Sequence, residues 1–333
     1  MRVTKHILAA FCAAALLAAS CAVTPEEDAY YSYDRVMSAW INVNYPGLGT
    51  FADTGAYILE MDRGNGPAVG DSAYIRAHYV KRTLDQEIVS TNIRRIAEQL
   101  GSYKNTTCYD GNTWRLDQGY LPDALEAILK TMRSGGHVTV ALPYSESDHD
   151  YSLYAAFSST SESDNLIIDL TIDTVLTDIY DYQDKTMKAW FEAHYASTDT
   201  LTKGLYFKKL VENLAETDTV AEGGSVKVRY IGRLLNGTVF DTNIEDTAKF
   251  YRIWSSSNSY SALSITYYKT DESKFSSENS VVDGFGKAIL GMNYGETAVA
   301  VFDSTLGYEE KGSSPSIPEY APLCFWLQIE DKD

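Results

Sequence analysis

Cysteine, histidine and basic residues are all scarce in this chain of 333 residues. There are four cysteines and five histidines, and because they stand singly no disulfide framework or metal-ligand spacing can be recognised. Lys and Arg number 28 against 46 Asp and Glu, so the formal net charge is −18. An acidic chain without a basic patch repels phosphates, which argues against nucleic-acid binding. The longest apolar run, residues 7–17, is too short to span a bilayer.

The first twenty residues have the pattern of an export signal. Arg2, Lys5 and His6 form a short basic head, the apolar run follows, and small residues lead to Cys21. This order predicts a signal peptide over residues 1–20. A plain cleaved signal and an apolar N-terminus buried in the fold are the other interpretations of the pattern.

Cys21 ends a segment that resembles the lipobox of bacterial lipoproteins, whose cysteine becomes the acylated first residue. Leu17 stands one position further from the cysteine than is usual. The resemblance implies lipidation of Cys21, and several acyl chains on one cysteine would hold the protein on a membrane. Ala22 after the cysteine favours the outer membrane by the same resemblance. We therefore expect a lipid-anchored protein of the cell envelope, periplasmic or surface-exposed, with Cys108 and Cys324 as its remaining thiols.

An internal repeat divides the rest of the chain into two similar units. Segments of the first half match segments of the second half in the same order, with an offset that drifts from about 150 to about 160 residues, as insertions in loops would produce. The matched pairs are 38–45 with 188–195, 55–59 with 204–208, 72–80 with 223–231, 90–92 with 241–243, 121–125 with 281–285, 132–135 with 292–295, and 166–172 with 323–329. Two tandem domains are predicted.

Each unit has an α+β pattern. Residues 226–234 alternate with period two, which is typical of a half-buried antiparallel strand, and Asn236-Gly237 predicts a hairpin turn into residues 238–240. Phe285, Ala288, Ile289 and Met292 lie on one face of a short helix that Gly295 can end. Residues 297–302 and 323–329 complete the predicted strands. One apolar helix face needs one apolar sheet face, so each unit is expected to be a curled antiparallel sheet wrapped around a short α-helix.

The segments outside the repeat are predicted to be connectors. Residues 22–36 are expected to form a polar tether, and residues 176–203, which carry Lys185 to Tyr195, are expected to form a helix between the units. The stretch 242–280 is long for a plain loop, so part of it is expected to add a strand. The predicted domain limits are 1–20 signal peptide, 21–50 tether and short helix, 51–175 first unit, 176–203 helical linker and 204–333 second unit.

The second unit resembles the FKBP-type peptidyl-prolyl cis-trans isomerases, and the motifs span nearly all of residues 204–333 in the family's order. The motifs are residues 228–232 (VRYIG), 235–241 (LNGTVFD), 281–285 (VVDGF) with Ala288, Met292 and Gly295, 306–308 (LGY), Ile317-Pro318, and 323–325 (LCF). Glu309 stands where the family commonly has Gly, and Glu319 follows Pro318 where a second Pro is common. These departures and the long 242–280 segment put turnover and substrate preference in question more than the fold.

The resemblance implies a site without a cofactor or metal. Phe285 would be the floor under a proline ring, where the family more often has Trp, and Asp241 would accept a hydrogen bond from Tyr230. The Val282 N–H and the Tyr308 hydroxyl would hold substrate carbonyls. The implied catalytic residues are Tyr230, Phe240, Asp241, Phe285, Tyr308 and Phe325, and the implied substrate-binding residues are Val281, Val282 and Ile317. Without the family, the three Phe residues are ordinary core positions and Asp241 is a turn or capping carboxylate.

The first unit resembles the family less. Tyr79 matches Tyr230, but the matched positions are otherwise aliphatic or uncharged: Val89 for Phe240, Ser90 for Asp241, Leu125 for Phe285 and Ile168 for Phe325. We expect an FKBP-like unit without isomerase activity, kept for docking, spacing or partner binding.

Three function classes remain open from the sequence. The leading one is an isomerase, active in its second unit only, that assists the folding of exported proteins and acts on proline-containing polypeptides. The alternative is a non-catalytic module that presents a groove to a peptide or protein on the cell surface. The third is a structural envelope lipoprotein with neither activity.

Overall fold

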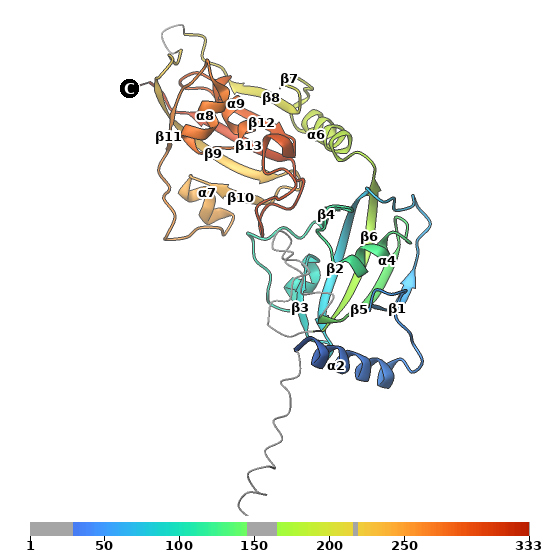
Figure 1. Cartoon of the computed structure of the whole chain (residues 1–333). Helices are drawn as coiled ribbons and strands as arrows, with labels where there is room; N and C mark the ends of the chain where they lie inside the picture. Colours follow the sequence, from blue (N-terminus) through green and yellow to red (C-terminus); the bar gives the residue numbers. More distant parts are fainter. Residues whose placement is uncertain (1–28, 145–164, 216–218, 333) are drawn as a thin grey trace, which may run out of the picture.

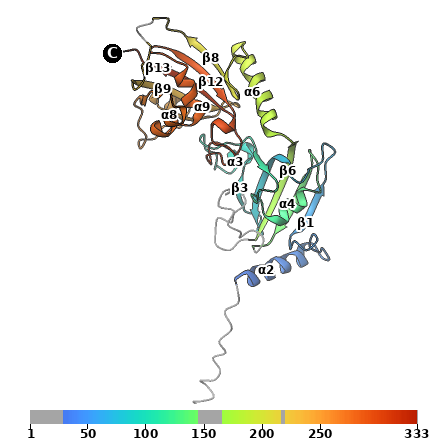
Figure 2. The same ribbon diagram turned by 45° about the horizontal axis from the view of Figure 1, so that its top comes forward.

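The computed structural model describes residues 29–144, 165–215 and 219–332. Two lobes are visible, and each is built on one antiparallel sheet (Figures 1 and 2). The predicted signal peptide and Cys21 lie outside the described residues. Within the described ranges, no helix combines the length and the apolarity needed to cross a bilayer.

The first lobe contains a six-stranded sheet in the order β1-β5-β6-β2-β3, with β4 paired to β2. Its strands are β1 (Tyr57–Asp62), β2 (Tyr74–Thr83), β3 (Ile88–Thr91), β4 (Asn112–Arg115), β5 (His137–Leu142) and β6 (Leu166–Leu176). Its helices are α2 (Ala29–Asn44), α3 (Arg94–Gln99) and α4 (Asp123–Leu129).

The second lobe contains a seven-stranded sheet in the order β10-β9-β13-β12-β8-β7, with β11 paired to β9. Its strands are β7 (Thr200–Thr202), β8 (Leu205–Val211), β9 (Ser225–Leu234), β10 (Val239–Thr242), β11 (Leu263–Thr266), β12 (Thr297–Phe302) and β13 (Leu323–Ile329). Its helices are α6 (Ile179–Tyr195), α7 (Glu245–Phe250), α8 (Glu272–Asn279), α9 (Asp283–Leu290) and the 3₁₀ turn η2 (Ser304–Leu306).

The two sheets share one pairing scheme. Val140 of β5 pairs with Ile58 on one side and Ile168 on the other. Ala300 of β12 pairs with Phe207 and Phe325 in the same way. The register of every matched strand therefore agrees with the repeat, and the predicted α+β class with two similar units is confirmed.

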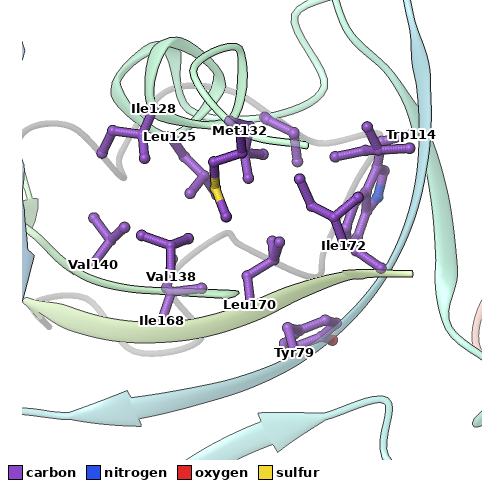
Figure 3. Packing of buried hydrophobic residues seen from close by; sticks show 14 of the residues in the cluster. Tyr79, Trp114, Leu125, Ile128, Met132, Val138, Val140, Ile168, Leu170 and Ile172 are labelled. Carbon is purple, nitrogen blue, oxygen red and sulfur yellow. The ribbon is translucent and has the colours of Figure 1, made fainter. Parts of the chain in front are cut away.

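Each sheet is covered by one helix on each face. Inside the first curl, α4 turns Leu125 and Ile128 toward Val138 and Leu170 (Figure 3). In the second unit, α9 fills the same place with its buried residues Phe285, Ala288 and Ile289. The opposite faces are covered by α2 through Met37 and Ile41, and by α6 through Met187 and Phe191. Because each helix has one apolar stripe, this arrangement buries all four stripes.

Most predicted elements occur as expected, with one correction in the second unit and one at the start of the described chain. The helix α9 ends at Leu290 with Gly291 as its C-cap, so Met292 lies after the helix and Gly295 (φ +74°) lies in the turn before β12. The tether predicted over residues 22–36 is wrong from Ala29 onward, where α2 begins. Packing of Met37 and Ile41 against Ala141 supports this helix, and local composition did not indicate that contact.

The long segment 242–280 is part of the fold. It contains α7, β11 and α8, and β11 pairs with β9, so the predicted extra strand is confirmed. Tyr267 and Phe275 are fully buried in the core of the second unit. The Tyr267 hydroxyl donates to the carbonyls of Ile289 at 2.6 Å and Met292 at 3.0 Å, so this segment also satisfies the C-terminal end of α9.

Candidate active site

Four aromatic side chains from four elements meet at one end of the second sheet. Phe285 of α9 lies edge-on to Phe325 of β13, with ring centroids 5.3 Å apart, and edge-on to Tyr230 of β9 at 5.8 Å. Phe240 of β10 lies edge-on to Phe325 at 5.6 Å. Such contacts are favourable beyond area burial alone. The expected residues are therefore brought together around Phe325.

The cluster has a buried floor and an exposed rim. Phe285 is 4% exposed and Phe325 6% exposed, whereas Tyr230 and Phe240 are partly exposed and Asp241 is exposed. Phe302, which the sequence did not single out, stacks on Phe325 with centroids 5.7 Å apart and an interplanar angle of 6°. An apolar floor below an accessible rim can bind an apolar ring presented from solvent.

Tyr230 and Asp241 form the polar edge of this cluster. The Tyr230 hydroxyl donates to Asp241 Oδ2 at 2.7 Å. Burial and the neighbouring Asp241 carboxylate raise the pKa of the Tyr230 hydroxyl well above its usual range. The phenol therefore keeps its proton and stays a donor at physiological pH.

A buried asparagine fixes the strand that carries Tyr230. Asn243 accepts from the Tyr230 backbone N–H at 2.9 Å and donates to the Val228 carbonyl at 2.8 Å. Asn92 makes the same two bonds in the first unit, to Tyr79 at 2.7 Å and Ala77 at 3.0 Å. The shared Thr-Asn of residues 91–92 and 242–243 was the sequence signal for this pair, and its structural role becomes visible only here.

Gly232 makes room for the rings, a role that sequence reasoning did not assign. A Cβ at this position would lie 2.6 Å from Phe240 Cε2 and 2.9 Å from Phe325 Cε1. Real Cβ atoms do not approach carbons so closely, so any larger residue would displace both rings. The glycine thus allows the aromatic rings to lie directly over β9.

Tyr308 and Ile317 reach the site from the rim loop, which we define as residues 303–322 between β12 and β13. Ile317 is buried within the same hydrophobic cluster as Phe285 and Phe325. Tyr308 is 39% exposed, and burial together with the Asp241 charge raises the pKa of its hydroxyl. Glu309, which departs from the family's usual Gly, has φ +52°, a conformation that favours glycine.

Val281 and Val282 lie before α9 at the edge of the same cluster. Both are partly buried against it, and Val282 is the extended N-cap of α9. The Val281 N–H donates to the Ser276 carbonyl at 3.1 Å, and the Val282 carbonyl accepts from Gly286 at 3.1 Å. Ring contacts and a hydrogen bond thus join Tyr230, Phe240, Asp241, Phe285 and Phe325, while Val281, Val282 and Ile317 belong to the wider core of the same unit.

The matched positions of the first unit form a closed aliphatic core. Leu125 on α4 and Ile168 on β6 below it are fully buried in the same core (Figure 3). Tyr79 is buried, and this burial raises the pKa of its hydroxyl to about 12. Lys81 stands in the place of Gly232 and is 1% exposed. Within the described part of this unit, Tyr79 contacts the ring of Trp114 at 6.3 Å between centroids, and the positions matched to Phe240, Phe285, Phe325 and Asp241 carry no ring and no acid.

Metal chemistry has no visible support in the structure. Among residues 29–144, 165–215 and 219–332, no group of three or more His, Cys, Asp or Glu side chains could hold a metal ion. The cysteines in these ranges, Cys108 and Cys324, are both free thiols.

Comparisons with known proteins concern mainly the second unit. Residues 216–330 match the family model for FKBP-type peptidyl-prolyl cis-trans isomerase. Peptidyl-prolyl cis-trans isomerase FKBP15-2 of Arabidopsis thaliana is 33% identical over 108 residues, which are 32% of this chain and 53% of that protein. A probable FKBP-type isomerase of Haemophilus influenzae is 26% identical over 144 residues, 42% of this chain and 49% of that protein. The chain thus spans about half the length of these two relatives.

A solved structure of the three FKBP domains of wheat FKBP73 is similar over a longer stretch. It is 20% identical, covers 84% of this chain and 95% of that chain, and has a TM-score of 0.30.

Proposed function

We propose that the second unit, whose residues 216–330 match the family model for FKBP-type peptidyl-prolyl cis-trans isomerase, catalyses cis-trans isomerisation of X–Pro bonds in polypeptides. The observation that carries the proposal is the gathering of Tyr230, Phe285 and Phe325 within 5.3–6.2 Å of one another, with Asp241 hydrogen-bonded at their edge. The first unit has no such set in its described residues, so the proposed activity is assigned to the second unit.

Rotation about an X–Pro bond requires loss of amide resonance, which sets a barrier of about 18–20 kcal/mol. The twisted amide carries less charge separation than the planar one. An apolar floor made by Phe285 and Phe325 therefore favours the twisted state relative to the planar amide, which prefers water. Catalysis by this route uses no nucleophile and no cofactor.

The polar groups of the rim supply orientation. In this proposal the Tyr308 hydroxyl and the Val282 N–H hold the carbonyls that flank the proline, while the proline ring rests on Phe285. Asp241, held by Tyr230 at 2.7 Å, faces the edge where the rotating carbonyl passes. Fixing both sides of the bond leaves the X–Pro torsion as the free coordinate.

The test is a peptide isomerisation assay on the full chain with matched tyrosine variants. Tyr230→Phe removes a hydroxyl that donates to Asp241 at 2.7 Å, and Tyr206→Phe removes one that donates to Asp184 at 2.9 Å on the outer face of the sheet. We expect Tyr230→Phe to lower kcat/KM by about threefold to tenfold and Tyr206→Phe to leave it unchanged.

A second pair of variants separates catalysis from binding. Asp241→Asn keeps the shape of the side chain and removes its charge, and Asp184→Asn is its control. A wild-type rate no faster than the uncatalysed rate would reject the isomerase proposal, and equal acceleration by wild type and Asp241→Asn would reject a role for Asp241. Tight binding of a proline-containing peptide without acceleration would instead favour the binding-module alternative. Full loss of turnover in Asp241→Asn would also support inactivity of the first unit, which is intact in that variant.

We further propose that Cys21 anchors the protein to the cell envelope, in the outer membrane, where the isomerase would assist exported chains. The support is the sequence pattern before Cys21 alone. Incorporation of labelled palmitate in a Gram-negative host, lost in Cys21→Ala, is the expected result. Equal labelling of both proteins, or release of the wild-type protein as a soluble mature chain, would exclude the anchor.

A further inference from the structure

Backbone hydrogen bonds within the rim loop hold it together as one compact segment. The Glu309 N–H donates to the Ser304 carbonyl at 2.7 Å, and the Tyr320 N–H donates to the Glu309 carbonyl at 3.0 Å. Ser313 and Ile317 exchange backbone hydrogen bonds of 2.7 and 2.9 Å. Because Tyr308 and Ile317 both stand on this piece, its position sets the position of two site residues at once.

Two hydrogen bonds from the first unit hold the outer part of this loop. The Cys108 N–H donates to the Pro315 carbonyl at 2.9 Å, next to Ile317. The Asn112 side-chain amide donates to Glu319 Oε2 at 2.9 Å. Both bonds are made to residues that follow Tyr308 in the loop, namely Pro315 and Glu319.

An aromatic contact adds a third point of attachment. Tyr74 of β2 lies edge-on to Tyr320, with ring centroids 5.2 Å apart, and Ile179 at the start of α6 completes this buried cluster. At the other end of the loop, Gln183 of α6 exchanges hydrogen bonds of 3.0 and 2.8 Å with the side chain and backbone of Ser304. The loop is therefore held at both ends by elements outside the second sheet.

Asn112 is itself fixed in the frame of the first unit. Its side-chain oxygen accepts from the Asn92 amide at 2.9 Å. Asn92 is buried and bonded to the backbone of β2 at Ala77 and Tyr79. A chain of directed hydrogen bonds thus connects β2 of the first unit to Glu319 of the rim loop, and such chains restrict motion more than isolated contacts do.

The two units do not contact each other along the whole of their interface. A cavity of about 120 Å³ lies there, lined by Cys108 and Thr113 from one side and by Leu234 and Glu319 from the other. Glu319 is largely removed from solvent, and this burial raises the pKa of its carboxyl. Since the loop is held at separate points instead of by a continuous apolar interface, the loss of one point should be measurable.

We propose that the first unit holds the rim loop in the position that binds substrate, with Asn112 as the positioning residue for Tyr308 and Ile317 of the second unit. The proposal rests on the proposed function of the second unit. It gives the inactive first unit a role within the same chain, namely to preset the affinity of the site for proline-containing peptides.

The test is a double-mutant cycle on the full chain with Asn112→Ala, Glu319→Ala and both together. Each single variant is expected to raise KM by about threefold to tenfold with kcat changed less than twofold, because the rim is displaced while the floor stays in place. The double variant is expected to be no worse than Asn112→Ala, since both single variants remove the Asn112–Glu319 hydrogen bond and only Asn112→Ala also removes the bond from Asn92. Multiplied effects in the double variant, or wild-type KM in Asn112→Ala, would overturn the proposal.

Two further variants control for general damage. Glu319→Gln keeps an acceptor oxygen for Asn112 and should retain a KM close to that of the wild type. Asn44→Ala removes an exposed asparagine of α2 that donates only to the Trp40 carbonyl of its own helix, and should change nothing. A raised KM in Asn44→Ala would show that any lesion of the first unit acts on the site, against a specific role for Asn112.

Hydrogen exchange separates this inference from the proposed function. Amides of residues 303–322 should exchange faster in Asn112→Ala than in Asn44→Ala, and unchanged exchange would overturn the inference. If the wild-type chain shows no turnover, the proposed function fails. The inference could still be decided in that case from hydrogen exchange of the loop and from the Kd for a proline-containing peptide. Faster exchange and weaker binding in Asn112→Ala would support it, and unchanged values would overturn it.

Discussion

Lys81 and Gly232 occupy the same position in the two units. Lys81 of β2 pairs with Ser90 and Ile168, and Gly232 of β9 pairs with Asp241 and Phe325. In the second unit the missing side chain lets the rings of Phe240 and Phe325 lie over the strand. In the first unit a buried lysine fills that position, and the neighbouring residues are aliphatic or small. This strand position, together with the four matched positions that lose a ring or the acid, separates an aromatic site from a closed core.

Gly232→Ala should disrupt the site without unfolding the second unit. The added Cβ would meet Phe240 and Phe325 at 2.6–2.9 Å, so both rings must shift, at a cost of about 1–3 kcal/mol in the free energy of unfolding. We expect kcat/KM to fall at least about tenfold. Gly70→Ala is the control, because nothing lies within 4 Å of a Cβ there. Unchanged activity in Gly232→Ala would show that the rings do not form the site.

Lys81→Met should stabilise the protein at neutral pH and lose this advantage as the pH rises. Burial lowers the pKa of Lys81 from 10.5 to about 8. Between about pH 8 and 10.5 the unfolded chain holds this proton and the folded chain does not. The free energy of unfolding of the wild type therefore increases with pH in this window. Below this window both states hold the proton, so the difference between them no longer changes with pH.

We therefore expect Lys81→Met to raise the free energy of unfolding by about 1–3 kcal/mol at pH 7, and by less at each step toward pH 10.5. Urea unfolding at several pH values measures this difference, and exposed Lys104→Met serves as the control. A difference that stays constant or grows with pH would contradict the assigned direction of the pKa shift.

The effect of Tyr230→Phe on isomerase activity should not depend on pH. Burial and Asp241 raise the pKa of the Tyr230 hydroxyl so far that it remains a donor throughout the working range. We expect the ratio of wild-type to Tyr230→Phe kcat/KM to be constant from pH 6 to about pH 10. If kcat/KM of the wild type decreased between pH 6 and about pH 10 while that of Tyr230→Phe stayed constant, the phenol would be titrating.

Cys108 and Cys324 should react slowly with iodoacetamide in the folded protein. Burial raises the pKa of Cys108 to about 11 and that of Cys324 to about 12, so the reactive thiolate is about one part in a thousand or less at pH 8. Alkylation followed by peptide mass spectrometry reports each thiol separately. We expect much faster labelling in urea, and faster labelling of Cys108 in Asn112→Ala than in wild type. Equal alkylation rates in the native protein and in urea would show that these thiols are not buried.

Much of the fold could be predicted because the signals are local or repeated. The period-two pattern of residues 226–234 and the Asn236-Gly237 turn act between neighbours in sequence, and they appear as β9, β10 and a tight turn with Gly237 at φ +90°. The end of α9 at Leu290 and the start of α2 at Ala29 were missed. These boundaries depend on packing against distant strands, which local patterns do not encode.

The site could be proposed from sequence only as an ordered set of motifs. The order identified Tyr230, Asp241 and Phe285, but the space made by Gly232 and the stacking of Phe302 arise from ring packing between strands far apart in the chain. Glu319 was visible in the sequence as a departure from the family pattern. Its partner Asn112 lies 207 positions earlier, so only the folded chain shows why a carboxylate is there.

The sequence by itself determined that the chain consists of two similar α+β units, and that only the second carries aromatic residues and an acid at the matched positions. The duplication, the strand periods and the residue types are properties of the linear order, which needs no fold to be seen. The tertiary structure decided that these side chains converge and that residues of the first unit contact the rim loop of the second. Both facts depend on the register of paired strands and on contacts between distant segments, which exist only once the chain has packed.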